Sequence, residues 1–374
     1  MANNFTYIMP QILAKGLLTL REQAIFARLV NVDYGNEAAQ KGQTIDVPVA
    51  PSYSATDVTP SPVHASVADS APGLVQITLN NWKHVPFYLT DKELVEIDEN
   101  RHFMPMAASG AIRALANSID QSISAQYTGV YGYVGTAGTS PFGSSILDAT
   151  NVRRVLNEQL APLDGRMLVL DPSAEANALA LPQLSDFDTT SDSGPRIEGE
   201  MGRKLGFRFF MSQQLPLHTA GTAATIVTQA STAAGAASVP LSASTTGTLV
   251  VGDIISFAGD SQTYVVGETV TVSTAIATAI DPVLQANVPA GTAVTKRASH
   301  TVNLGFTREA FAFANRPLRS DMELGNRITA ATDPVSGISL RLEVSRQYKM
   351  VQWDFDVLWG TKLIWPEFAV RLAG

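Results

Sequence analysis

The side chains most used in catalysis and metal binding are scarce in this sequence. No cysteine is present, which excludes thiolate metal sites, disulfides and thiol nucleophiles. The five histidines are His64, His84, His102, His218 and His300. None lies within four positions of another, so no two of them can bind a metal ion from adjacent turns of one helix.

Two short motifs approach known chemical signatures, and each lacks a residue that the chemistry needs. Residues 194–199 have the spacing of a phosphate-binding loop, but Glu200 stands where a lysine must meet the phosphate. Residues 138–142 miss the last glycine of a nucleophile elbow. Neither motif therefore supports phosphate binding or nucleophilic catalysis.

Acidic residues gather at two places, and neither forms a complete cation site. A calcium-binding loop is suggested by Asp186, Asp188 and Asp192, but Ser191 replaces its turn glycine and Ile197 its bidentate glutamate. The acidic run 91–99 is a second candidate cation site, although it follows Thr90 as the first turn of a capped helix would, where carboxylates favour the helix dipole. We predict no catalytic, cofactor-binding or metal-binding residue, and no cofactor.

Composition limits the class of partner. The chain has 374 residues, of which 45% are hydrophobic and 16% charged, and its net charge is −8. Such a chain can bury a core, but it lacks the clustered basic residues of a strong nucleic-acid binder. Its densest basic group, Arg203, Lys204 and Arg208, has two interpretations: a phosphate contact, or a charge cluster facing solvent or another subunit.

Charged residues also interrupt the most apolar N-terminal stretch, residues 12–30. We expect no membrane span and no secretory signal there, and hence a soluble protein made in the cytoplasm.

The N-terminal part reads as two extended elements. Leucines and an alanine at helical spacing predict a helix that Pro10 opens and that ends before Asn31. Alternating apolar residues predict strands at 45–49 and 75–79. Residues 51–73 between them are rich in proline and have no apolar period, so this segment packs on another molecule or forms a floppy hairpin.

The next part reads as mixed α and β structure. A long helix is predicted from Pro105 to about Tyr127, long enough to act as a spine for a sheet. The pattern then predicts a loop at 129–143, a helix at 152–160, a strand at 166–170, a helix at 174–181 and a strand at 205–211.

Residues 219–299 differ from the rest in composition. No lysine or arginine occurs from Phe209 to Thr295. Short strands are predicted at 225–227, 238–241, 253–258, 263–266, 269–272 and 293–295, which is typical of a small all-β domain. The alternative is a low-complexity linker, but the strands are apolar. An inserted domain must leave and return at nearby points, so we expect strands 205–211 and 301–306 to lie side by side. Further strands are predicted near 338–344 and 353–359.

Several segments, in this order along the chain, resemble one known family. They are residues 30–34, 41–47, 85–94, 197–207, 215–221, 303–311, 316–318, 337–342 and 365–367. Together they are similar to the coat proteins of tailed double-stranded DNA phages related to Salmonella phage P-twenty-two, which have the Hong Kong 97 type of capsid fold. The resemblance implies that residues 303–311, with 316–318, form a re-entry strand and helix, and that residues 337–342 and 365–367 form closing strands.

The resemblance also implies an α+β fold with a definite division of the chain. It comprises an N-terminal arm (1–41), an extended two-stranded loop (42–89), a peripheral domain with the spine helix (90–150), the first part of an axial domain (151–218), an inserted β domain (219–299), and the closing strands of the axial and peripheral domains (300–374). We place the insertion on the outer face of a shell, because its charged residues before Lys296 are all acidic and would repel packaged DNA.

The function implied by the resemblance is that of a major capsid protein, and not of an enzyme. Such a chain assembles with itself into hexamers and pentamers of an icosahedral head, with a scaffolding protein and a portal as further partners. The head encloses double-stranded DNA without sequence specificity and is assembled in the host cytoplasm. An encapsulin-like compartment shell is the alternative with the same fold, and an enzyme with an unrecognised carboxylate site is a third hypothesis.

Overall fold

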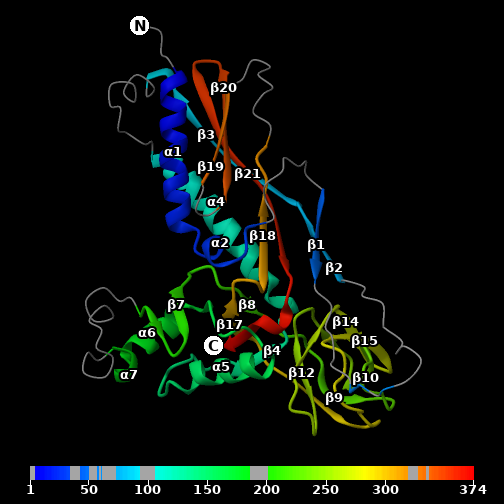
Figure 1. Ribbon diagram of the computed structural model, residues 1–374. Helices are drawn as coiled ribbons and strands as arrows, with labels where there is room; N and C mark the ends of the chain where they lie inside the picture. Colours follow the sequence, from blue (N-terminus) through cyan, green and yellow to red (C-terminus); the bar gives the residue numbers. More distant parts are fainter. Residues whose placement is uncertain are drawn as a thin grey trace.

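The computed structural model describes residues 5–33, 43–49, 57–58, 60, 73–92, 106–185, 201–318, 327–333 and 337–374. Figure 1 shows a tall upper part, made of a long sheet and two helices, above a broader lower part. The described chain begins near the top and ends in the middle of the lower part. The segments 186–200 and 93–105 are outside the described residues, and with them the proposed calcium and phosphate motifs and most of the acidic run 91–99.

The upper sheet is antiparallel and is built on one long strand, β21 (Met350–Leu363). Its order is β18 (Phe311–Asn315), β21, β20 (Ser339–Gln347) and β19 (Arg327–Thr332). Strand β3 (Asn81–Thr90) pairs with β21 from Met350 to Trp359. Alternation turns Trp353 and Phe355 of β21 toward a core shared with the helices. The predicted strands at 338–344 and 353–359 are confirmed.

Two helices cover the inner face of this sheet: α1 (Phe5–Gln23) and α4 (Met106–Ser124). The short α2 (Phe26–Leu29) follows α1, and the 3-10 turn η1 (Ala125–Gly129) follows α4. The predicted spine helix is confirmed. The prediction that Pro10 opens the first helix is wrong, because α1 starts at Phe5 and contains this proline. Pro10 has no backbone N–H to donate within the helix. The helix extends past it because burial of Met9 stabilises the first turns.

A second sheet lies in the lower part. Its order is β4 (Gly132–Gly135), β22 (Ala369–Ala373), β17 (His300–Thr307), β5 (Arg166–Leu170), β7 (Phe207–Met211) and β6 (Arg203–Lys204), and β8 (Leu217–His218) pairs with β17. Helices α5 (Leu147–Glu158), α6 (Pro172–Ala180) and α7 (Pro182–Ser185) accompany it. The helices and strands predicted between 152 and 211 are confirmed, but the predicted loop 129–143 contains strand β4.

The prediction that the two strands flanking the insertion, 205–211 and 301–306, lie side by side is wrong. Strand β5 lies between β7 and β17, and it pairs parallel with the first and antiparallel with the second. All five residues of β5 are buried, as expected for a strand at the centre of the sheet. The insertion still leaves and returns at one place, because Leu217 and His218 of β8 pair with Thr301 and His300.

Residues 224–296 form a closed barrel with its own core. The barrel order is β10 (Ser238–Thr245), β15 (Ile276–Asp281), β13 (Tyr264–Val266), β12 (Ile254–Phe257), β16 (Ala293–Lys296) and β9 (Ala224–Thr228). A separate pair joins β11 (Gly247–Leu249) to β14 (Val270–Val272). All six predicted strands are confirmed; β11 and β15 were not predicted.

The N-terminal hairpin pairs β1 (Thr44–Val49) with β2 (Gly73–Thr78), from Thr44 opposite Thr78 to Val49 opposite Gly73. The expected loop 42–89 is therefore shorter than predicted, because residues 81–89 belong to β3 of the upper sheet. Because β3 pairs with β21 over its whole length, residues 81–89 are part of the sheet and do not extend from the body. Most of residues 50–72 are outside the described part.

Two expectations from the resemblance are wrong in detail. The re-entry strand β17 is not followed by a helix: after a turn at 308–310 the chain forms strand β18. Phe311 and Phe313 of β18 join the main core, while Ala312 and Ala314 face the base of the hairpin, so both faces of this strand are covered. Residues 366–368 form the 3-10 turn η2 (Pro366–Phe368) instead of a strand, because Pro366 lacks the amide that a sheet requires.

Candidate functional site

The histidines, which are the side chains best suited to catalysis or metal binding in this sequence, lie in separate parts of the molecule. His84 is exposed on β3, where its Nδ1 lies 2.9 Å from Oδ2 of Asp354. His218 and His300 meet in the lower part, and the segments that hold His64 and His102 are outside the described residues. Among the described residues no three His, Cys, Asp or Glu side chains gather as a metal site would require. The candidate functional elements are therefore the attachments of the arm, the hairpin and the barrel to the body.

The N-terminal helices are tied to the spine helix by a buried carboxylate. Asp120 of α4 accepts hydrogen bonds from the backbone amides of Ile25, at 3.0 Å, and Phe26, at 3.1 Å, where α2 begins. These amides have no partner within α2, so the carboxylate caps this helix from outside. Burial raises the pKa of Asp120 to about 7, although the two amides and Arg28 act in the opposite direction.

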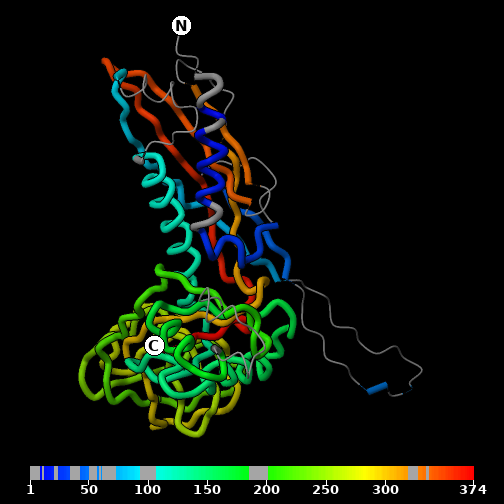
Figure 2. Tube along the Cα trace, turned by 90° about the vertical axis from the view of Figure 1, so that its left-hand side faces the viewer, coloured from blue at the N-terminus to red at the C-terminus, as the bar shows by residue number. Residues whose placement is uncertain are grey.

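The hairpin β1–β2 is attached through an apolar base. Val47, Ile77 and Leu79 pack against Ala312 and Ala314 of β18 and against Leu358 and Ile364. The backbone approach is close at Gly360 of β21, where an added Cβ atom would lie 2.5 Å from the carbonyl oxygen of Thr78. Figure 2 shows the hairpin at the side of the long sheet.

The barrel is attached through a small apolar contact beside a polar one. Tyr131, just before β4, packs with Ile254 and Val265 of the barrel. The Thr263 hydroxyl donates a hydrogen bond to the carbonyl of Tyr131, 2.7 Å away. Both contacts join the segment that follows the spine helix to strands β12 and β13.

The polar contact is a buried network centred on His218 and Asp253. Nε2 of His218 lies 3.0 Å from Oδ1 of Asp253, and both side chains are almost fully buried. Nδ1 of His218 lies 3.0 Å from the hydroxyl of Tyr127. The Asp253 carboxylate also accepts from the backbone amides of Gly221 and Val250. It therefore joins the start of the insertion, the barrel and the end of the spine.

A buried arginine completes this network. Arg371 of β22 donates from Nη1 to the carbonyl of Gly252, 2.7 Å away, and its guanidinium lies over the ring of Tyr127. Burial lowers the pKa of Arg371 to about 9, opposed mainly by Tyr127 and Asp253, so the group stays charged at neutral pH. Its Nε and Nη2 atoms are buried without a hydrogen-bond partner among the described residues.

His300 lies against the same network. Its ring centroid is 5.3 Å from that of His218 and 5.4 Å from that of Tyr133. Burial, with smaller effects of Arg371 and His218, lowers the pKa of His300 to about 4, although the hydrogen bond to Ala298 and the charge of Asp253 act in the opposite direction. The sequence held one signal for this meeting: His218 and His300 stand directly outside the predicted insertion 219–299, whose ends must be neighbours. Nothing in the sequence indicated that Asp253 and Arg371 would join them.

The predicted basic cluster lines a pocket of the lower part. Arg203 and Arg208 stand directly opposite each other on β6 and β7. With Glu175 and the segment 209–211 they line a pocket of about 410 Å³. Like charges in this cross-strand position repel, so the pair favours an acidic group as its neighbour. Lys204 points elsewhere, and its Nζ donates to the carbonyl of Leu184.

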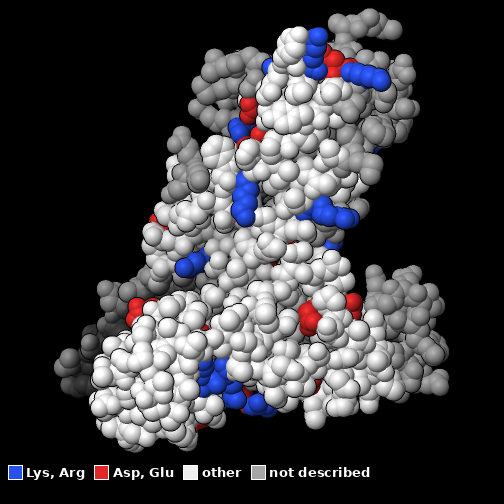
Figure 3. All heavy atoms as spheres, turned by 180° about the vertical axis from the view of Figure 1, so that it is seen from behind, with Lys and Arg blue, Asp and Glu red and all other residues white. Residues whose placement is uncertain are grey.

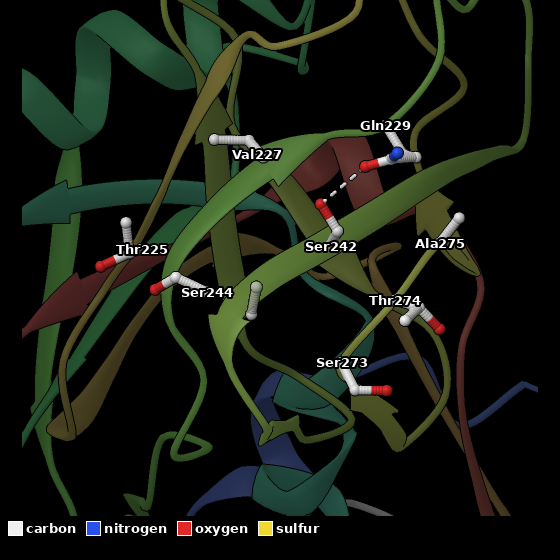
Figure 4. A pocket seen from close by; sticks show the side chains of 9 residues that line it. Thr225, Val227, Gln229, Ser242, Ser244, Ser273, Thr274 and Ala275 are labelled. Carbon is white, nitrogen blue, oxygen red and sulfur yellow. Dashed lines mark hydrogen bonds between the residues drawn. The ribbon is translucent and has the colours of Figure 1, made fainter.

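The barrel surface is nearly uncharged. Figure 3 shows the barrel, at the lower left, almost free of acidic and basic side chains on this face. A shallow pocket of about 390 Å³ opens between β9, β10 and the turn before β15, and it is lined by hydroxyl, amide and small apolar groups (Figure 4). The Ser242 hydroxyl, 3.0 Å from the amide oxygen of Gln229, holds one wall. No aromatic or charged side chain lines this pocket.

No helix within the described part of the chain combines the length and the apolar character that a membrane crossing requires. No protein-family model matches the sequence, and no curated protein matches it.

Solved structures do match the fold. A structure from Mycobacterium phage Che8 superposes with a TM-score of 0.52 at 13% identity, covering 93% of this chain and 90% of that one. The capsid of cyanophage P-SCSP1u gives 0.49 at 13% identity, with 94% and 88% covered. A virus-like particle from Pyrococcus furiosus gives 0.47 at 9% identity, with 97% and 98% covered. The first likeness shows a shared fold and confirms the expected α+β fold of tailed-phage capsids; the other two add nothing to that conclusion.

Proposed function

We propose that this chain is the major capsid protein of a tailed phage, a structural subunit that assembles with copies of itself into an icosahedral head around double-stranded DNA. The observation that carries the proposal is the fold, which extends over nine-tenths of this chain and of the Che8 structure. Fold alone does not determine function. The attachments of the arm and the hairpin supply the second support.

The hairpin supports assembly because it has too little core to stand alone. On one face of the hairpin, Val47 and Ile77 are buried against the body. On the opposite face Leu74 is 59% exposed, and the sequence continues into a proline-rich segment without apolar period. Such an element gains stability by packing on a neighbouring copy, and contacts of this head-to-tail kind build large closed shells.

Further partners follow from the same role. A scaffolding protein and a portal complete the proposed head, which is assembled in the host cytoplasm and becomes the virion shell. We assign residues 1–41 to the arm and 42–89 to the loop, of which residues 81–89 pair with the upper sheet as part of β3. The peripheral domain comprises residues 90–150, the axial domain residues 151–218 with 300–374, and the insertion residues 219–299. The barrel carries only Asp260, Glu268 and Asp281 as partly or fully exposed charges before Lys296, which favours an outward position away from DNA.

DNA contact in this proposal is weak and without sequence preference. The net charge is −8, and basic residues are dispersed over the chain. Few phosphates can then be neutralised, and what affinity exists must fall steeply with salt. Filter binding at low and at physiological salt tests this, and tight sequence-selective binding would contradict it.

The decisive experiment is electron microscopy of the purified full-length chain, with light scattering as a solution measurement. We expect closed shells of uniform diameter, built from pentamers and hexamers. Because assembly in this family commonly needs a scaffold, the chain is examined alone and after co-expression with the genes beside it. A chain that stays monomeric under both conditions, or that turns over a substrate as a monomer, would refute the proposal.

A further inference from the structure

The junction between barrel and body is held by titratable side chains instead of a large apolar contact. The apolar part is small and centres on Tyr131, Ile254 and Val265. Beside it, His218 of β8, Asp253 before β12, His300 of β17 and Arg371 of β22 bring four elements together. Two of these elements, β8 and β17, are the points at which the chain enters and leaves the insertion.

The hydrogen bonds at His300 define its protonation state. Nδ1 lies 2.8 Å from the carbonyl oxygen of Ala298. A carbonyl only accepts, so Nδ1 carries the hydrogen and Nε2 is the bare nitrogen. Nε2 is buried and has no partner among the described residues. A second proton on His300 would therefore place an N–H group in the interior with nothing to accept from it.

The charges that face His300 make that proton still less favourable. The groups around it are Tyr127 of η1, Tyr133 of β4, His218 of β8, Asp253, Arg297 after β16, and Arg371 of β22. Arg371 is fully buried and charged, and Arg297 lies over the ring of Tyr133. Asp253 is the one carboxylate in this set, and it is already bonded to His218 and two amides. Lys296 donates to the carbonyl of Gly221 at the edge of the same junction.

We propose that His218, Asp253, His300 and Arg371 form a proton-operated lock, which holds the barrel in one orientation on the body while His300 is neutral and releases it when His300 is protonated. The inference concerns the attachment of the barrel and does not depend on the proposed function.

The pH window follows from the state of His300. Its pKa is about 4 in the folded chain and 6.5 when exposed. Below 6.5 the opened junction binds a proton that the closed junction refuses, so the closed state loses stability as the pH falls from about 6.5 toward 4. Above 6.5 this contribution is complete and constant.

The test compares hydrogen exchange of the full-length chain at pH 7 and pH 4.5, corrected for intrinsic exchange. In the wild type we expect protection of the connectors 219–223 and 296–299 to fall about tenfold or more, while amides of β21 stay protected. His300→Asn keeps a donor for the carbonyl of Ala298 and removes the titration, so its connectors should respond much less. His84→Asn, which removes an exposed histidine on β3, is the matched control and should behave as the wild type does.

Three results would refute the proposal. They are wild-type connectors that do not respond to pH, a His300→Asn chain that responds as strongly as the wild type, and a His84→Asn chain that has lost the response. If His300→Asn does not fold, histidine-labelled nitrogen NMR of the unassembled wild type decides. His300 should keep a bare Nε2 down to pH 5, and a titration near 6.5 would refute the proposal.

Discussion

The hairpin β1–β2 and the barrel both extend from the body, but they differ in where their apolar side chains go. The barrel buries its own, among them Ile226, Leu241 and Phe257, in a core whose described members all belong to the insertion. The hairpin buries Val47 and Ile77 against strands of the body. One element is therefore a domain with a polar attachment, and the other is an extension of the body core.

This difference predicts what each attachment responds to. Apolar contact is non-directional and scales with buried area, so the hairpin base should respond to changes in volume. A buried polar network depends on geometry and charge state, so the barrel junction should respond to protonation and to loss of a partner. The arm combines both modes, because α1 packs its apolar stripe on the core while Asp120 binds α2.

The largest effect is expected from shortening the hairpin. Because Gly73 pairs with Val49, a deletion of residues 51–72 retains every pair of β1 and β2. The subunit should stay soluble and folded, because this segment adds nothing to the described core, and it should fail to form shells. Sedimentation and electron microscopy measure this. Normal shells from the deleted chain would remove the main reason for treating the hairpin as an assembly element.

The next effect concerns Asp120. Its pKa is about 7 folded and 3.8 as a free side chain, so the folded chain holds a proton that the unfolded chain has lost between these values. The free energy of unfolding should therefore fall by on the order of 2–4 kcal/mol from this group as the pH rises from 4 to 8. Asp120→Asn abolishes that dependence. Denaturant unfolding of both chains at each pH isolates the difference.

Glu158→Gln is the control for Asp120→Asn. Glu158 is an exposed carboxylate that pairs with Arg154 one turn away on α5. Its replacement should leave the pH dependence of stability nearly unchanged. An Asp120→Asn chain with the same pH dependence as the wild type would mean that the arm is held by apolar packing alone.

A smaller effect is expected at the hairpin base. Gly360→Ala places a Cβ atom 2.5 Å from the carbonyl oxygen of Thr78, so backbone must shift, and we expect a loss of about 1–3 kcal/mol. Gly110→Ala on the exposed face of α4 meets nothing within 4 Å and should stabilise by about 0.5–1 kcal/mol. Thermal unfolding compares the two. Equal shifts would show that the base is not tightly packed.

The sequence predicted those elements whose side chains alternate strongly or form a continuous apolar run. The strand at 166–170 is completely buried and was found with its bounds, and β12 and β13 were found from their aliphatic and aromatic residues. Strand β15 was missed because its residues between Ile276 and Ile280 are alanine and threonine, whose hydrophobic contrast is low.

Contacts between distant segments were the part that sequence patterns did not reach. A helix was expected with the re-entry strand, where the chain forms β18, and nothing local shows that the alanines of β18 face a hairpin more than two hundred residues earlier. The order of β17, β5 and β7 also depends on which strand takes the centre of the sheet, a choice made by burial over the whole sheet. The buried junction joins residues 127, 218, 253, 300 and 371, and no local pattern connects them.

The smallest effect is expected from cutting the barrel out of the chain. Residues 219–299 include every barrel strand and its core, with the ends joined in the intact chain by β8 and β17. Expressed alone, this segment should give a β-sheet circular dichroism spectrum and unfold cooperatively, with a stability of only a few kcal/mol because it is small and has no disulfide. Its amide spectrum should overlay that of the barrel in the full chain, except near Ile254 and Val265, which lose their contact with Tyr131. A disordered spectrum would show that the barrel, like the hairpin, depends on the body, and the contrast between the two would fail.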